Sequence, residues 1–118
     1  MKIRFKGNFL RYRLTRSDVA KLTTLGHVDD KVDFGEHSLI YSIKRTHSDQ
    51  LSATYKDNII TLFMPETMID EWLNTNRVGF ENNNEPLHLL VEKDFTCLDN
   101  VTEDQSDNYP NPLAEKES

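Results

Sequence analysis

The chain has 118 residues, with 14 lysines and arginines against 20 aspartates and glutamates, and a formal net charge of −6. That length favours one domain, and the acidic balance argues against bulk binding of nucleic acid. The single cysteine excludes an internal disulfide and a zinc site built from cysteines, and no stretch approaches the roughly 18 apolar residues of a membrane span.

Residues 2–6 open the chain with basic side chains alternating with apolar ones, which is the period-two pattern of a half-buried strand. Gly7 and Asn8 interrupt the pattern and predict a turn or a bulge. The alternation resumes over residues 10–14 and predicts a second strand. Residues 1–16 hold six lysines and arginines and no acidic residue, so these strands predict a locally basic face.

A short helix is predicted directly after the second strand. Thr15 and Asp18 approximate a capping box, with aspartate in place of the usual glutamate or glutamine. Apolar residues then follow at helical spacing, and Gly26 suits the C-terminal cap, where φ is positive. Because the helix is short, we expect packing against the rest of the chain to stabilise it.

The middle of the chain predicts three or four further strands. The alternating or apolar runs cover residues 28–34, 39–44, 51–55 and 59–63. An Asp-Asn pair at residues 57–58 separates the last two runs. Both residue types tolerate left-handed φ, so this pair predicts a hairpin turn.

A second helix and a last strand are predicted in the following segment. Pro65 suits the first turn of a helix, and Trp72 belongs to an apolar stripe at helical spacing, where we interpret it as a core anchor. Residues 74–76 end that helix, and residues 78–80 predict a short strand. Residues 87–91 form the most apolar strand, which we place at the centre of the sheet.

These elements predict an α+β domain over residues 1–98, built from a mainly antiparallel, curved sheet of five to seven strands and two short helices. Residues 99–118 hold six acidic residues and one lysine, and they bury too little apolar surface to offset their ordering entropy. We therefore predict an acidic C-terminal tail, extended or disordered. We find no internal repeat. The N-terminal alternation lacks the apolar run of a signal peptide, so we expect a cytoplasmic protein.

Four sequence segments resemble a known family. Two lie near the start, at residues 1–8 and 11–17, and two near the end, at residues 91–98 and 103–112. Together they resemble a family of small bacterial proteins catalogued as a domain of unknown function. The resemblance spans nearly the whole chain and implies a cytoplasmic bacterial protein of one domain. It brings no activity, cofactor or catalytic residue.

The sequence contains no standard catalytic motif. A glycine-rich phosphate loop, the HExxH and GxSxG motifs and a calcium-binding loop are all missing. We therefore favour a small protein-interaction or regulatory module over an enzyme, and the sequence indicates no cofactor and no metal. A protein partner or a homodimer is the expected interaction.

A second hypothesis is a small enzyme or metal-binding protein with a site near the cysteine. It would gather Cys97, Asp94, Glu92 and His88. The neighbouring carboxylates disfavour the thiolate that a nucleophile requires, and a small buried apolar role is the simpler reading of Cys97. Along a regular strand, His88 and Glu92 would lie roughly 13 Å apart, too far for two ligands of one ion.

The basic N-terminal strands carry the remaining hypotheses. Arg4, Arg11 and Arg13 could contact phosphates of a nucleic acid, which the overall charge disfavours. In the preferred hypothesis, the acidic tail packs across this basic face, and Tyr109 and Asn111 belong to a rigid Tyr-Pro-Asn-Pro segment that helps to hold it. A protein partner with a basic groove could then compete for the tail. The alternative is a tail that serves only to keep the chain in solution, as its composition equally allows.

Overall fold

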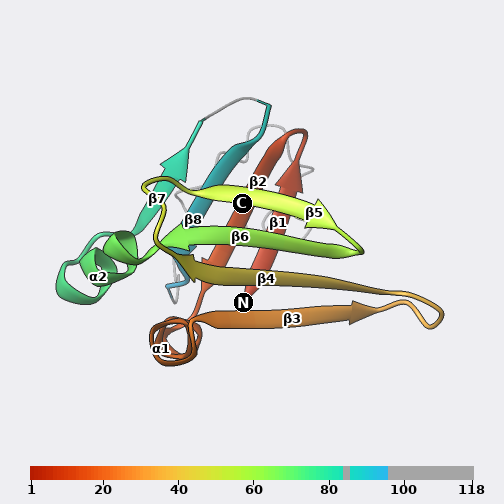
Figure 1. The fold of residues 1–118 in the computed structure, drawn as a ribbon, viewed down its shortest axis with the longest axis horizontal. Helices are drawn as coiled ribbons and strands as arrows, with labels where there is room; N and C mark the ends of the chain where they lie inside the picture. Colours follow the sequence, from red (N-terminus) through yellow and green to blue (C-terminus); the bar gives the residue numbers. More distant parts are fainter. Residues whose placement is uncertain (84–85, 96–118) are drawn as a thin grey trace, which may run out of the picture.

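The computed structural model describes residues 1–83 and 86–95. Within these residues the chain forms eight strands and two helices (Figure 1). The strands are β1 (Lys2–Lys6), β2 (Phe9–Leu14), β3 (His27–Asp33), β4 (Ser38–Thr46), β5 (Ser52–Lys56), β6 (Ile59–Pro65), β7 (Gly79–Asn82) and β8 (His88–Lys93). The helices are α1 (Arg16–Leu25) and α2 (Glu66–Asn74).

The strands are divided between two four-stranded sheets. The first sheet has the order β1-β2-β8-β7 and the second has the order β3-β4-β6-β5. In each sheet the outer pairs are antiparallel, whereas the central pair is parallel. The predicted α+β class with two helices is therefore confirmed, as is the interior position of β8. The prediction of a mainly antiparallel sheet of five to seven strands is matched only in part: four of the six strand pairs are antiparallel, but eight strands form two mixed sheets, because periodicity identifies a strand but not its partner.

Residues with a left-handed backbone conformation form the turns of two hairpins. Gly7 has a φ of 56° in the turn between β1 and β2, and Asp57 and Asn58 have φ values of 54° and 65° between β5 and β6. Two consecutive residues with positive φ make the turn whose twist matches that of the flanking strands. The Asp-Asn pair therefore forms the hairpin that the sequence predicts.

Capping at both ends defines α1. The Thr15 hydroxyl accepts a hydrogen bond from the Asp18 N–H at 3.2 Å, and the Thr15 N–H donates to the Asp18 carboxylate at 2.9 Å. Gly26 closes the helix with a φ of 83°. The predicted capping box and glycine cap are thus confirmed.

We expect Asp18→Asn to lower the free energy of unfolding by about 1 kcal/mol at neutral pH. Burial raises the pKa of the Asp18 carboxyl, but hydrogen bonds from Thr15 and from the N-terminal nitrogen of Met1, 3.0 Å away, together lower it below its ordinary value. A lowered folded-state pKa adds stability above the ordinary pKa of about 3.9, and this stability is lost as the pH falls through the folded-state value.

Urea unfolding from pH 7 to pH 2, with Ser17→Ala as an exposed control in the same turn, would measure this effect. The difference between wild type and Asp18→Asn should shrink in acid. A difference that stays constant across this range would show that the carboxylate charge contributes nothing.

Pro65 departs from its predicted place. It is the last residue of β6, opposite Thr46, and it precedes α2 as the N-cap, with φ −57° and ψ 137°. The prediction that it lies in the first helical turn is wrong, because the proline ring fixes φ but leaves ψ free to stay extended. Buried Ile69 and Trp72 anchor α2 to the core, as predicted for Trp72.

The core lies between the two sheets. The strands of the first sheet run steeply across those of the second, and both helices lie toward one end (Figure 1). The buried side chains at the centre of the core come from four strands: Leu10, Tyr12 and Leu14 of β2, Ile43 of β4, Ile60, Leu62 and Met64 of β6, and Leu89 and Val91 of β8. The Tyr12 hydroxyl donates to the Ile60 carbonyl at 3.3 Å and so ties the sheets together. Burial raises the pKa of Tyr12.

The two sheets are related by an internal repeat. The unit β1-β2-α1-β3-β4 recurs as β5-β6-α2-β7-β8, and the two units exchange strands so that each sheet contains two strands of each. The β1–β2 register, with Lys2 opposite Arg13, recurs 50 residues later in β5–β6, where Ser52 lies opposite Phe63. In the parallel pairs, Phe9 lies opposite His88 and its equivalent, Ile59, lies opposite Ile40, so β4 and β8 correspond at an offset of 48 residues (88 − 40). The sequence analysis missed this repeat because the equivalent residue types differ.

Hydrogen bonds outside the strands repeat as well. The carbonyl of Asn8 in the first hairpin turn accepts from the His88 N–H at 2.9 Å, and the carbonyl of Asn58 in the equivalent turn accepts from the Ile40 N–H at 3.0 Å. The first bond joins the β1–β2 turn to β8, which runs parallel to β2. The second joins the β5–β6 turn to β4, which runs parallel to β6. The two halves are therefore built alike down to their turns.

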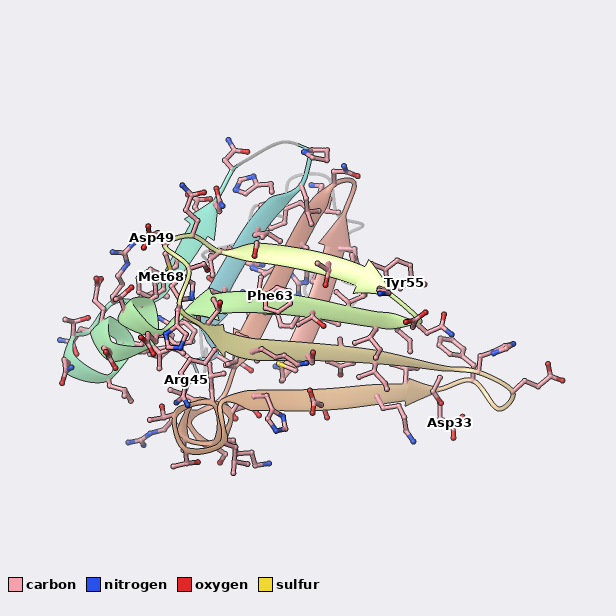
Figure 2. The ribbon with its side chains drawn as sticks, viewed as in Figure 1. Asp33, Arg45, Asp49, Tyr55, Phe63 and Met68 are labelled. Carbon is pink, nitrogen blue, oxygen red and sulfur yellow. The ribbon has the colours of Figure 1, made fainter. Side chains whose placement is uncertain are left out.

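Basic side chains at equivalent positions of β4 and β8 donate hydrogen bonds to carbonyls at the C-terminal ends of the two helices. Arg45 of β4 donates through Nη1 to the Thr23 carbonyl of α1 at 2.7 Å, and Lys93 of β8 donates through Nζ to the Trp72 carbonyl of α2 at 3.2 Å. Figure 2 shows Arg45 beside α1. Neither helix has a basic residue in its own last turn, so the neighbouring strand supplies the charge that the helix dipole favours there.

Candidate functional site

Five basic side chains lie on the outer face of the first sheet. We call this surface the cationic face; it comprises Lys2, Arg4 and Lys6 of β1 and Arg11 and Arg13 of β2. Lys2 lies opposite Arg13 and Arg4 lies opposite Arg11 in the antiparallel pair. Because side chains alternate along a strand, all five project away from the core. The structure thus brings together the three arginines that the sequence singles out.

The cationic face is hollowed at its centre. A depression of about 250 Å³ is lined by Lys2, Ile3, Arg4, Arg11 and Arg13. Four of these five side chains are cationic, so the depression favours a negatively charged group. Its small volume fits a carboxylate or a short acidic side chain better than a large ligand.

Glu92 of β8 holds two of the arginines in position. Its Oε1 atom lies 2.9 Å from Nε of Arg11 and 2.8 Å from Nε of Arg13. The Glu92 side chain is only 15% exposed, so water screens these contacts weakly. No local sequence pattern places Glu92 here, because its side chain reaches the arginines through the parallel pairing of β2 with β8.

A second carboxylate borders the cationic face. Asp94 follows β8, and its Oδ2 atom lies 3.0 Å from Nζ of Lys2. The Asp94 N–H donates to the Leu14 carbonyl at 2.9 Å. The chain therefore leaves β8 beside the end of the cationic face.

The residues proposed for a metal or reactive cluster contact different partners. Nε2 of His88 lies 2.7 Å from Oε2 of Glu81, whereas Glu92 contacts the arginines and Asp94 contacts a lysine. Within residues 1–83 and 86–95, no three histidine, cysteine or acidic side chains are grouped so that they could hold a metal ion. Cys97, Tyr109 and Asn111 lie outside the described residues.

An aromatic pair borders the cationic face at the hairpin end. Phe9 lies opposite Lys6 in β1–β2 and opposite His88 in β2–β8. The Phe9 and His88 rings meet edge to face, with their centroids 4.6 Å apart. This contact could not be predicted from the sequence, because it depends on the cross-strand register of β2 with β8.

The internal repeat provides a built-in comparison for the cationic face. Counting 50 residues on, its three arginines correspond to Thr54, Thr61 and Phe63 in β5 and β6. The same hairpin therefore forms with uncharged residues at these positions. The hairpin geometry itself therefore does not dictate arginine at these positions.

Comparison with known proteins gives a family but no activity. A family model described as a family of unknown function, DUF7009, matches residues 1–113. No curated protein and no solved structure matches the chain. Neither helix in the described part of the chain is long and apolar enough to cross a membrane.

Proposed function

The chain belongs to this family of unknown function, DUF7009, and we propose from its geometry that it is a binding module whose cationic face takes an acidic segment of a protein partner. The observation that carries the proposal is the cluster of three arginines on the first hairpin, where the equivalent hairpin of the second sheet has two threonines and a phenylalanine. A surface of this kind recognises its partner by charge and needs no catalytic group.

The contact with Glu92 supports a carboxylate as the bound group. One of its oxygens accepts a charge-assisted hydrogen bond from Nε of Arg13 at 2.8 Å and forms an ion pair with Arg11, whose Nε atom lies 2.9 Å away. Aspartate and glutamate side chains of a partner present the same group. Because Glu92 is part of the fold, the arginines are already oriented before a partner arrives.

Nucleic acid is a poorer candidate for the same face. The formal net charge of −6 repels a polyphosphate beyond the immediate contact. Tyr12, the aromatic residue between Arg11 and Arg13, is fully buried, so it cannot stack on a base. A short acidic peptide meets the same long-range repulsion, but it carries fewer charges than a polyphosphate chain and needs no ring to stack on.

The acidic C-terminal segment of the same chain is the natural competitor for a partner. The chain leaves β8 beside Lys2, and residues 99–118 carry six acidic residues. In the proposal, this segment occupies the cationic face when no partner is bound. Individual exposed ion pairs contribute only about 0.2–1 kcal/mol, so an acidic partner could displace it.

Binding of a short polyglutamate peptide to the full chain would test the proposed function. We expect Arg4→Glu combined with Lys6→Glu to weaken binding about tenfold or more. The matched control is Lys44→Glu with Lys56→Glu, which makes the same change in net charge on the second sheet. All four side chains are exposed, so we expect both double variants to fold.

The control variant should bind the peptide as the wild type does, and added salt should weaken both complexes. Equal losses in the two double variants would show that only net charge matters. Tighter binding of a single-stranded oligonucleotide than of the peptide would also contradict the proposal and would favour nucleic acid.

A further inference from the structure

An apolar pocket lies between the two sheets, away from the helices. Its volume is about 410 Å³. Six of its lining residues form three pairs that the internal repeat makes equivalent: Phe5 with Tyr55, Leu10 with Ile60, and Leu39 with Leu87. We call it the axial pocket, because equivalent residues from both halves surround it.

Two aromatic side chains that line the axial pocket are exposed to solvent. Phe5 is 55% exposed and Tyr55 is 68% exposed, although both occupy inward-facing positions of their strands. The helices lie toward the opposite end of the sheets (Figure 1), and Tyr55 lies at the far end of β5 from them (Figure 2). The sheets are therefore closed by helices at one end and left open at the other.

We propose that the axial pocket binds a neutral, mostly apolar small molecule. Its volume falls within the roughly 300–1,000 Å³ of small-molecule sites, which are concave and mainly apolar. None of its lining residues is charged, so an ionic group would lose its hydration without gaining a partner. Exposed aromatic rings at such a site gain most from an apolar ligand that covers them.

Two polar residues complete the wall. Asn8 donates through Nδ2 to the Pro86 carbonyl at 2.9 Å and so ties the first hairpin turn to the segment before β8. Thr54 also lines the pocket, beside Tyr55. A ligand with one or two hydrogen-bonding groups on an apolar body matches this lining.

This site is independent of the proposed function, because the axial pocket faces the core side of β1 and the cationic face lies on its outer side. Salt should distinguish the two. Binding of an apolar probe in the axial pocket should not weaken as salt is added, whereas binding of an acidic peptide should.

Fluorescence titration of the full chain with N-phenyl-1-naphthylamine, a neutral apolar probe, would test the proposal. We expect saturable binding of one probe per chain, with methyl NMR shifts at Leu10, Leu39, Ile60 and Leu87. Phe5→Ser should weaken binding about tenfold. The matched control, Phe34→Ser, removes another exposed phenylalanine, 70% exposed against 55% for Phe5, from the β3–β4 turn and should leave binding unchanged.

Filling the pocket gives a second, independent variant. Ala53→Phe places a ring inside the axial pocket and should abolish probe binding; Tyr55→Ser, at an exposed position, provides the same test should the filled variant fail to fold.

Three results would overturn the proposal. The first is equal loss of binding in Phe5→Ser and Phe34→Ser. The second is probe-induced shifts centred on methyl groups outside the axial pocket. The third is movement of the same four methyl signals by Tyr109→Ala without probe, which would show that the chain's own C-terminal segment fills the pocket.

Discussion

Trp72→Ala is expected to lower the free energy of unfolding by about 3–5 kcal/mol, the largest loss of any substitution considered for this chain. Trp72 is 2% exposed, and its ring lies 5.8 Å from that of Phe80 between centroids. Truncation would leave a cavity between α2 and β7. It would also loosen the helix end whose carbonyl accepts from Lys93.

Urea unfolding followed by circular dichroism would measure this loss, because the variant lacks the only tryptophan of the chain. Leu73→Ala is the matched control: it truncates the adjacent residue of the same helix, which is 52% exposed. We expect the control to cost less than about 1 kcal/mol. Similar losses in the two variants would show that Trp72 is not the anchor of α2.

Gly79→Ala is expected to have the second largest effect, about 1–3 kcal/mol or more. A Cβ atom at this position would lie 2.5 Å from the Val91 carbonyl oxygen and 2.8 Å from Cβ of Glu92. The first of these neighbours is backbone and cannot move without disturbing β8. The requirement for glycine is therefore steric, arising from the close approach of β7 and β8.

The same substitution should disturb the cationic face. Gly79 lies directly opposite Glu92, which positions Arg11 and Arg13. We expect shifted NMR signals of both arginine Nε groups together with the lower stability. Glu81→Ala, at an exposed position of the same strand, should leave those two signals in place. Unchanged arginine signals in Gly79→Ala would show that β7 does not transmit the displacement.

The individual elements could be predicted from the sequence because each has a local pattern. Alternation predicted β1 and β2, the capping box predicted α1, and the Asp-Asn pair predicted the β5–β6 turn. The division into two sheets could not be predicted, because it depends on parallel pairings such as Phe9 with His88, which join opposite ends of the chain. No local pattern records such a pairing.

The candidate site likewise contains residues that could be predicted from the sequence and residues that could not. Arg4, Arg11 and Arg13 could be grouped in advance because a two-residue turn sets the β1–β2 register. Glu92 could not be added to them, since only the parallel pairing of β8 brings it there. The axial pocket was also beyond prediction, because it requires knowing that the inward-facing Phe5 and Tyr55 stay uncovered.

The central claim is that the cationic face, and not its equivalent on the second sheet, is the functional surface. Mapping backbone amide shifts of the full chain during titration with a polyglutamate peptide tests it most directly. The account predicts shifts concentrated in β1, β2 and β8, with β5 and β6 silent. Shifts of equal size in β5 and β6, or scattered over both sheets, would contradict it.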